Sequence, residues 1–428
     1  MMYVSNIIKQ KEIEKWQKGD NILIKSQTGT GKSHFIMNTL SRYYEKNNLK
    51  TLIFSNRDLL KQQNKRNALR NVECINYQFI EQLDPEKLEE KLAHYDVINF
   101  DECHYFFKDA SFNYNTEKIL KYALKQTNQI KIFSSATPEP LFYTGIKFAY
   151  QYDIPKNYSF IEKIIFYDDI ADILDEIIQS ENKSLCFFSN ATKACKFALA
   201  HSKDAQFYCS KGNSLWRVAD KDIALDIVIN YTFSKKVLAT TTVLENGVTI
   251  IDSALKNIVI DFYDPITILQ TLGRKRIQSK DKITLYLRVP TRYDIQRKAY
   301  LKSGSDSLAA QLYVEFLKDH FKEIRKVGYI FYWCNYFKFS VQNVDYRNKY
   351  GEIREFMKAN CNKCVTKEKL EELFGKFMPV KQDARLVTYN NFMKKSLLDY
   401  KLVSKRVSSE KARNRKIFVE KIKKEVDG

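Results

Sequence analysis

Short apolar runs recur along residues 1–140, and longer segments with helical periodicity separate them. The runs that we interpret as strands are 21–26, 51–55, 72–76, 96–100 and 131–135. Buried strands that alternate with helices are typical of a parallel sheet covered on both faces. The pattern therefore predicts a doubly wound, parallel α/β domain over residues 1–150.

A second series of apolar runs begins near residue 160 and predicts another α/β domain, at residues 151–290. Its expected strands are 163–167, 184–188, 206–209, 237–241, 258–262 and 283–287. Residues 151–158, which read Q-Y-D-I-P-K-N-Y, are expected to link the two domains. After Pro290 the pattern changes to helical periods rich in Lys, Tyr and Phe, which predicts a mostly helical C-terminal region at 291–428.

The end of the chain shows three helical segments followed by two strand-like runs. The helices are expected at 351–360, 366–377 and 388–400, and the strands at 401–407 and 415–422. Three helices and a hairpin resemble a winged-helix module, which would begin near residue 351. The aromatic run at 329–339 is expected to form buried helix core rather than a platform for stacking bases.

The composition favours a soluble cytoplasmic protein. Of 428 residues, 44% are hydrophobic and 29% are charged, and the N-terminus lacks the layout of a secretory leader. The most apolar stretch, 329–337, is far shorter than the roughly 20 residues of a membrane span. Eight scattered cysteines predict reduced thiols. The close pair Cys361 and Cys364 lacks the further ligands of a zinc site.

The formal charge of +20 suggests a polyanionic partner, most simply nucleic acid, although a basic solvated surface would give the same balance. Residues 381–428 hold 14 basic and 6 acidic side chains, a net charge of +8. In a winged helix, the third helix and the turn of the hairpin would suit a duplex. The candidate contacts are Asn390, Asn391, Lys394, Lys395, Lys411, Arg413 and Arg415. The alternative is a basic accessory domain that contacts the protein itself.

Residues 26–33 read S-Q-T-G-T-G-K-S and follow the first expected strand. A glycine-rich turn between a strand and a helix gathers backbone N–H groups around a phosphate, Lys32 would reach the outer phosphates, and Ser33 would bind Mg²⁺. The pattern is incomplete, because its first position is Ser26 where the usual phosphate loop has glycine. The candidate nucleotide contacts are Ser26, Gln27, Thr28, Gly29, Thr30, Gly31, Lys32 and Ser33.

Residues 101–104 read D-E-C-H and follow the strand at 96–100. Carboxylates at the end of a parallel strand point into the crevice where such sheets bind ligands. Asp101 would hold Mg²⁺, mostly through water, and Glu102 would orient or deprotonate the attacking water. The alternative is an acidic helix start without a catalytic role.

Taken together, S-Q-T-G-T-G-K-S and D-E-C-H resemble motifs I and II of the superfamily 2 helicases, of the DExH-box type. S-A-T at 135–137 matches motif III, and the segments 54–63, 76–80 and 184–190 resemble motifs Ia, Ib and IV. The spacing of motifs II and III resembles viral and mobile-element relatives. The resemblance covers residues 10–290 and implies two tandem RecA-like domains that bind ATP and Mg²⁺ between them.

The later motifs depart from the family in places. Motif V resembles 238–250, with matches at Thr241 and Gly247, while Thr249 stands where many relatives have Asp. In motif VI, Q-T-L-G-R-K-R, the matching residues are Gln270, Gly273 and Arg274. The segment is one residue short, so Arg276 is either the second arginine finger or a solvated basic residue. Gln10 resembles the glutamine that reads adenine in many relatives, or is an exposed polar residue of a helix.

The resemblance implies an ATP-dependent nucleic-acid helicase or translocase. The winged-helix-like end favours DNA over RNA as the partner, and we expect 3′–5′ movement. The alternative is a DNA-binding ATPase switch, a loader or initiator that separates no strands. No membrane partner is expected, and a P-loop kinase or GTPase would leave motifs V and VI unexplained.

Overall fold

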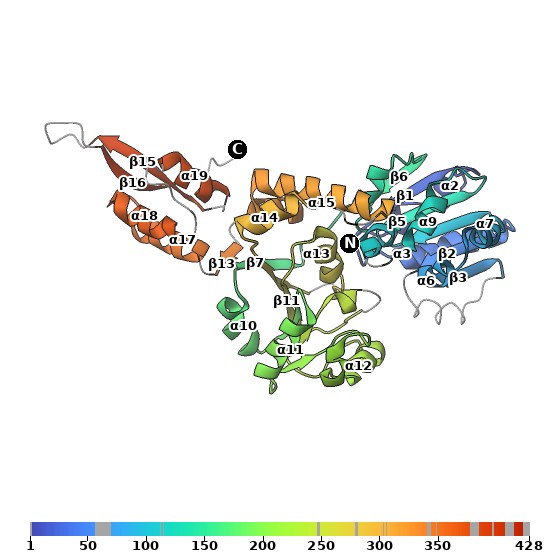
Figure 1. Cartoon of the computed structure of the whole chain (residues 1–428), viewed down its shortest axis with the longest axis horizontal. Coiled ribbons are helices and arrows are strands. Elements are labelled where there is room, and N and C mark those ends of the chain that lie inside the picture. The colour runs from blue at the N-terminus through green and yellow to red at the C-terminus, as the bar shows by residue number, and fades with distance from the viewer. Residues whose placement is uncertain are drawn as a thin grey trace.

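The computed structural model describes most of the chain. The described residues are 2–55, 70–111, 113, 115–245, 249–278, 281–302, 304, 306–339, 344–347, 349–376, 385–395, 398–406 and 415–422. Figure 1 shows two α/β domains joined by a long helix, with a small separate unit at the C-terminal end. Within these residues, no helix combines the length and the apolar character that crossing a membrane requires.

The first domain is built on a six-stranded sheet of order β3-β2-β4-β5-β1-β6, and its strands pair in parallel. The strands are β1 Asn21–Lys25, β2 Thr51–Ser55, β3 Val72–Asn76, β4 Val97–Asp101, β5 Ile130–Ser135 and β6 Tyr150–Asp153. The first five confirm the expected strands. The expected linker at 151–158 is wrong at its start, because β6 pairs with β1 at the sheet edge.

Helices on both faces bury this first sheet, as the apolar pattern predicts. They are α1 Val4–Ile7, α2 Gln10–Ile13, α3 Lys32–His34, α4 Ser41–Lys46, α6 Tyr77–Glu81, α7 Pro85–Ala93, α8 Tyr105–Lys108 and α9 Thr116–Leu124. A π-helical segment, Phe35–Leu40, joins α3 to α4, and short 3₁₀ turns lie at Asp109–Ser111 and Glu139–Thr144. Separate hydrophobic clusters fill the two sides of the sheet.

The second domain has a seven-stranded parallel sheet of order β13-β7-β12-β11-β8-β10-β9. Its strands are β7 Ile161–Tyr167, β8 Lys183–Phe187, β9 Ala205–Phe207, β10 Val237–Thr240, β11 Leu255–Ile260, β12 Ile283–Arg288 and β13 Val344–Tyr346. Its helices are α10 Leu174–Ile178, α11 Ala191–Ala200, α12 Asp222–Asn230 and α13 Pro265–Leu272, with 3₁₀ turns at Ile170–Ile173, Ser214–Val218 and Thr242–Glu245. The strand β13 was not expected. It comes from the C-terminal region and adds an edge strand to this sheet, next to β7.

Three helices follow the second domain: α14 Arg292–Ala299, α15 Leu308–Val327 and α16 Tyr329–Phe337. The helix α15 begins against the first domain (Figure 1), where its residues Ala309, Tyr313 and Phe316 join the hydrophobic core of that domain. Its later residues Phe321 and Ile324 pack in the core of the second domain. The aromatic run of α16 is buried, with Trp333 fully inaccessible and Tyr329 and Phe337 nearly so. This confirms the expectation of helix core.

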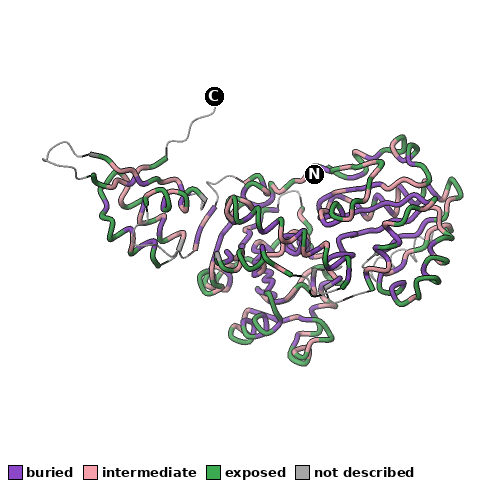
Figure 2. Tube along the Cα trace, turned by 45° about the horizontal axis from the view of Figure 1, so that its top comes forward, coloured by how far each residue is buried: buried purple, intermediate pink, exposed green. Residues whose placement is uncertain are grey.

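The C-terminal unit contains α17 Lys349–Ala359, α18 Lys367–Gly375 and α19 Leu386–Lys395. Its antiparallel sheet has the order β14-β16-β15, from β14 Cys364–Val365, β15 Tyr400–Arg406 and β16 Arg415–Lys421. The three helices and the hairpin match the expected elements, while the short strand β14 was not foreseen. Figure 2 shows that buried residues concentrate in the two parallel sheets and that this unit has a thinner core.

Candidate nucleotide site

The loop after β1 has the conformation that a phosphate site requires. Gly29 and Gly31 have φ angles of +92° and +78°, in the left-handed region that favours glycine. The Ser26 N–H donates to the Ser135 carbonyl at 3.0 Å, which anchors the loop to the end of β5. The Thr30 hydroxyl donates to the Gln27 carbonyl at 2.7 Å and closes the loop on itself.

Lys32 begins the helix after this loop, and its side chain folds back across it. The Lys32 Nζ donates to the Ser26 carbonyl at 3.0 Å and lies 3.7 Å from the Glu102 Oε1. Lys32 is buried, while Ser33 beside it is half-buried. The lysine thus links the expected phosphate loop with the D-E-C-H segment at the carboxyl edge of the same sheet.

The D-E-C-H segment is held by hydrogen bonds from the neighbouring strand. Asp101 ends β4, and its Oδ1 accepts from the Ser134 hydroxyl at 2.8 Å. Glu102 has a φ of +53°, which is rare for a residue with a side chain and is typical of functional sites. The His104 Nδ1 lies 3.4 Å from the Glu102 Oε2 and 2.9 Å from the Ser135 hydroxyl. Motifs I, II and III therefore form one connected polar network.

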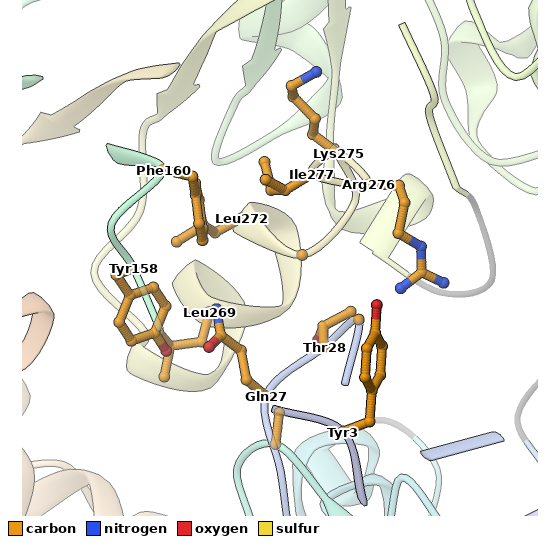
Figure 3. A pocket seen from close by; sticks show the side chains of 13 residues that line it. Tyr3, Gln27, Thr28, Tyr158, Phe160, Leu269, Leu272, Lys275, Arg276 and Ile277 are labelled. Carbon is orange, nitrogen blue, oxygen red and sulfur yellow. The ribbon is translucent and has the colours of Figure 1, made fainter. Parts of the chain in front are cut away.

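The second domain closes over this loop at the end of α13. A Cβ added at Gly273 would lie 2.6 Å from the Thr28 Cβ, and a Cβ added at Gly29 would lie 3.1 Å from the Arg276 Nη1. The Arg276 N–H donates to the Ile250 carbonyl at 2.8 Å, which fixes this segment against the motif V region. Figure 3 shows the Arg276 side chain reaching toward Thr28 from the opposite domain.

A cavity lies between the two domains at this contact. Its lining residues are Tyr3, Gln27, Thr28, Gly29, Ala136, Tyr158, Phe160, Leu269, Leu272, Gly273, Lys275, Arg276 and Ile277. Sequence reasoning missed Tyr3, which precedes α1 and whose hydroxyl points toward Arg276 in Figure 3. No local sequence pattern marks Tyr3, because a tertiary contact places it: the Val4 N–H donates to the Thr30 carbonyl, which holds Tyr3 next to the phosphate loop.

Arg274 takes a different position from Arg276. It is buried, and its Nε and Nη2 donate to the Gln270 carbonyl and side-chain oxygen at 3.0 and 3.1 Å. It is not among the residues that line the cavity. Burial lowers the pKa of Lys108 to about 8, opposed by Asp264 and Asp109, and the positive charge of Arg274 adds a smaller lowering effect.

The other expected site residues are placed as follows. Gln10 is exposed and is not among the residues that line the cavity. Its amide donates to the Glu14 carboxylate at 2.9 Å. The Gln27 side chain bonds the main chain of Asn157 rather than pointing at the loop centre. Gly247 lies outside the described residues. Thr241 directly follows β10, and Thr249 is half-buried beside Ile250.

The residues present fit a nucleotide with Mg²⁺. Within the described part of the chain, the buried Ser26 Oγ, Thr28 Oγ1 and Gln270 Nε2 have no hydrogen-bond partner. Buried polar atoms of this kind are normally satisfied, and of these three residues Thr28 lines the cavity between the domains. Ser33 and Asp101 supply the oxygen donors that Mg²⁺ prefers. Cys103, next to Glu102 in the chain, is buried in the hydrophobic core of this domain, and burial raises the pKa of its thiol, so it stays protonated.

The basic C-terminal unit offers some of the expected contacts. Lys394 and Asn391 are exposed on α19, and Arg415 is exposed at the start of β16. Asn390 was expected to face a duplex, but its amide donates to the Leu402 carbonyl and accepts from the Leu402 N–H, at 2.9 and 2.7 Å. It therefore joins α19 to the hairpin. Lys411 and Arg413 lie outside the described residues, as does the side chain of Lys395.

Comparison with known proteins gives one family match. The family model described as type III restriction enzyme, res subunit (ResIII), matches residues 2–82. No curated protein matches the chain. Among solved structures, a point variant of S. cerevisiae Dbp5 bound to RNA and ADP BeF3 shares 15% identity, with a TM-score of 0.48, over 72% of this chain and 88% of that one. The DEAD-box helicase Mss116 bound to ssRNA and UDP-BeF shares 13% identity, with a TM-score of 0.49, over 86% and 89% of the two chains.

Proposed function

We propose that this protein is a nucleic-acid-dependent ATPase of the superfamily 2 helicase type. The observation that carries the proposal is the position of Arg276, whose guanidinium comes from the second domain and lies against Gly29 of the phosphate loop. Because residues of both domains form this site, nucleotide binding and hydrolysis would change the distance between the two domains. The match of residues 2–82 to a restriction-enzyme res subunit supports the same class of activity.

Each polar group at the site has a distinct role in hydrolysis. Lys32 binds and positions the outer phosphates, and Ser33 and Asp101 would hold Mg²⁺, which supplies charge neutralisation when bound. Glu102 orients the attacking water and accepts its proton, and His104 and Lys32 fix its carboxylate. Arg276 adds positive charge where negative charge builds on the leaving phosphates.

The proposed partner is DNA, moved with 3′–5′ polarity. The net charge of +20 supports a polyanion, and the exposed Lys394 and Arg415 lie on the helix and hairpin that a winged helix presents to a duplex. DNA is preferred to RNA because such a unit suits a B-form groove, while the major groove of an RNA duplex is too narrow for side chains to read.

A second candidate is an ATPase switch that loads or initiates without separating strands. The helix α15 favours it, because this helix buries Tyr313 and Phe316 in the core of the first domain and Phe321 and Ile324 in the core of the second. The Tyr313 hydroxyl also donates to the Asp264 Oδ2 at 2.5 Å, at the start of α13. These contacts resist a wide opening of the two domains.

The decisive experiment measures the ATPase rate of the parent and of Lys32→Ala with single-stranded, duplex and forked DNA and with RNA. We expect DNA to stimulate the parent and Lys32→Ala to lose hydrolysis, because the outer phosphates lose their positioned cation. Hydrolysis within a few-fold of the parent would contradict the site. Strand displacement on the forked DNA supports the helicase, while ATPase activity without displacement supports the switch.

A further inference from the structure

The segment that connects the two domains is bonded directly to the phosphate loop. The connector comprises residues 154–160, between β6 and β7. The Gln27 Nε2 donates to the Asn157 carbonyl at 3.1 Å, and the Asn157 N–H donates to the Gln27 Oε1 at 2.8 Å. At the start of the connector, the Ile154 N–H donates to the Lys25 carbonyl at 2.8 Å. The connector is therefore bonded both to the end of β1 and to the beginning of the phosphate loop.

The two bonds use both the nitrogen and the oxygen of the Gln27 amide. Its oxygen accepts and its nitrogen donates, and both partners are main-chain groups of one connector residue. Gln27 is 9% exposed, so these bonds are largely shielded from water. An amide held at both ends moves with the loop, and any displacement of the loop is passed to Asn157.

The far side of the connector is fixed to α16. The Lys156 Nζ donates to the Tyr336 hydroxyl at 2.8 Å and lies 4.6 Å from the centre of that ring. The Tyr158 ring packs edge-on against Phe337, with centroids 4.9 Å apart. Burial, helped by the nearby Lys25, lowers the pKa of Lys156.

Tyr158 lies between two cavities. It lines the cavity between the domains, together with Gln27, Thr28 and Arg276, and also the open cavity between the connector and α16. Figure 3 shows its ring beside Leu269 of α13 and near Gln27. A shift of the connector therefore changes the nucleotide cavity and the α16 surface together.

We propose that Gln27 is a positioning residue that couples the state of the phosphate loop to the connector and, through Lys156 and Tyr158, to α16. This inference rests on the nucleotide site proposed above. Binding of nucleotide reshapes the loop, the Gln27 amide carries that change to Asn157, and the aromatic contacts carry it to the helix before β13 and the C-terminal unit. Each step of the route runs through covalently continuous groups, hydrogen bonds or packed aromatic rings.

Hydrogen–deuterium exchange of the full chain tests the coupling, with and without a non-hydrolysable ATP analogue and Mg²⁺. In the parent, we expect the nucleotide to slow exchange in peptides covering 26–33, 154–160 and 329–337. Gln27→Ala should keep the protection of 26–33 but reduce that of 154–160 by roughly tenfold, as expected for the loss of two neutral hydrogen bonds. Unreduced protection of 154–160 in this variant would overturn the proposal.

Asn157→Ala is the matched control, because Gln27 bonds the main chain of Asn157 and this variant keeps both bonds. It loses the side-chain oxygen that accepts from the Ser159 N–H at 2.9 Å, and its connector should respond like the parent's. Should Gln27→Ala fail to fold, Gln27→Glu serves instead, since a carboxylate still accepts from the Asn157 N–H but cannot donate to its carbonyl. An intermediate connector response supports the coupling, and a parental response overturns it.

Tyr336→Phe tests the next link. It removes the hydroxyl that accepts from Lys156 and keeps the ring, so the response of 154–160 should persist while that of 329–337 falls. An unchanged response of 329–337 would overturn the link through Lys156 to α16. If the parent shows no protection at 26–33, the nucleotide site itself is wrong. Protection there without any response at 154–160 would overturn the coupling alone.

Discussion

The side chain of Thr28 lies against Gly273 of the opposite domain, so closely that a Cβ at Gly273 would stand 2.6 Å from the Thr28 Cβ and 2.7 Å from its Oγ1. Side chains do not tolerate such distances, so any larger residue at 273 would push the phosphate loop and α13 apart. The glycine has an ordinary φ of −72°, which means that space, rather than backbone conformation, requires it. The contact defines how closely the domains approach.

We expect Gly273→Ala to lower the ATPase rate on the order of tenfold to a hundredfold, because an ångström-scale displacement of Arg276 from the phosphates is enough for such a loss. Steady-state hydrolysis measures it, with thermal unfolding to check the fold. Gly212→Ala is the matched control, since a Cβ at Gly212 meets nothing within 4 Å. A rate equal to the parent's would mean that the catalytic state does not use this contact.

Most of the fold could be predicted from the sequence, because each buried parallel strand is a short apolar run that can be recognised on its own. All the strands expected between 21 and 287 are present, within a few residues of their expected ends. The edge strands β6 and β13 were not predicted, because their residues, Y-Q-Y-D and V-D-Y, do not form apolar runs. β6 alternates half-buried and exposed residues, as at Tyr150 and Gln151, and its pairing with β1 is a tertiary event.

The site residues that belong to short sequence motifs could be predicted. Lys32 and Glu102 come together as their motifs imply, at 3.7 Å. Tyr3 carries no motif, and its place over Gly31 depends on how α1 packs. Likewise, the pattern of α19 cannot distinguish a readout side chain from one that bonds its own hairpin, as Asn390 does.

His320 makes stability depend on pH. It is 8% exposed on α15 among Phe316, Phe321 and Tyr332, and burial lowers its pKa from 6.5 to about 4 while Asp264 opposes the shift. A folded pKa below the unfolded one means that the neutral form supports the fold. This stability is present above about pH 6.5 and is lost as the pH falls toward 4.

His320→Gln should therefore flatten the decline in the free energy of unfolding between neutral pH and about pH 4.5, by up to about 3 kcal/mol. Urea unfolding at the two pH values gives this difference. His94→Gln is the control, because His94 is exposed at the end of α7 and should leave the pH dependence unchanged. An equal decline in His320→Gln and the parent would show that other groups control acid unfolding.

The C-terminal unit should contribute phosphate contacts that salt weakens. We expect the double change Lys394→Ala and Arg415→Ala to reduce the slope of log affinity for duplex DNA against log salt by about 2, since each contact releases close to one counterion. Fluorescence anisotropy over a salt series measures the slope. Lys358→Ala is the control, because Lys358 is exposed on α17 and paired with Glu355 at 3.6 Å. An unchanged slope in the double variant would place the DNA elsewhere.

Substitutions of the two arginines of motif VI should have different effects. Arg276 is exposed at the domain contact, and its guanidinium faces Gly29, whereas Arg274 is buried and bonded to Gln270. Arg276→Ala should leave thermal stability unchanged and lower the maximal ATPase rate more than ATP affinity, because its contact strengthens as charge builds on the phosphates. Arginine fingers are worth about 10³–10⁵ in rate, so an effect below roughly tenfold would exclude this role.

Arg274→Ala should instead lower thermal stability as well as rate. It leaves the buried Gln270 carbonyl and side-chain oxygen without these donors, a loss of roughly 1–3 kcal/mol for each unsatisfied group. Melting temperature and single-turnover hydrolysis, measured on both variants, separate the two roles. If Arg274→Ala kept the parental melting temperature and lost rate by the factor expected for Arg276→Ala, Arg274 would act directly on the phosphates, and α13 would have to turn during the reaction to bring it there.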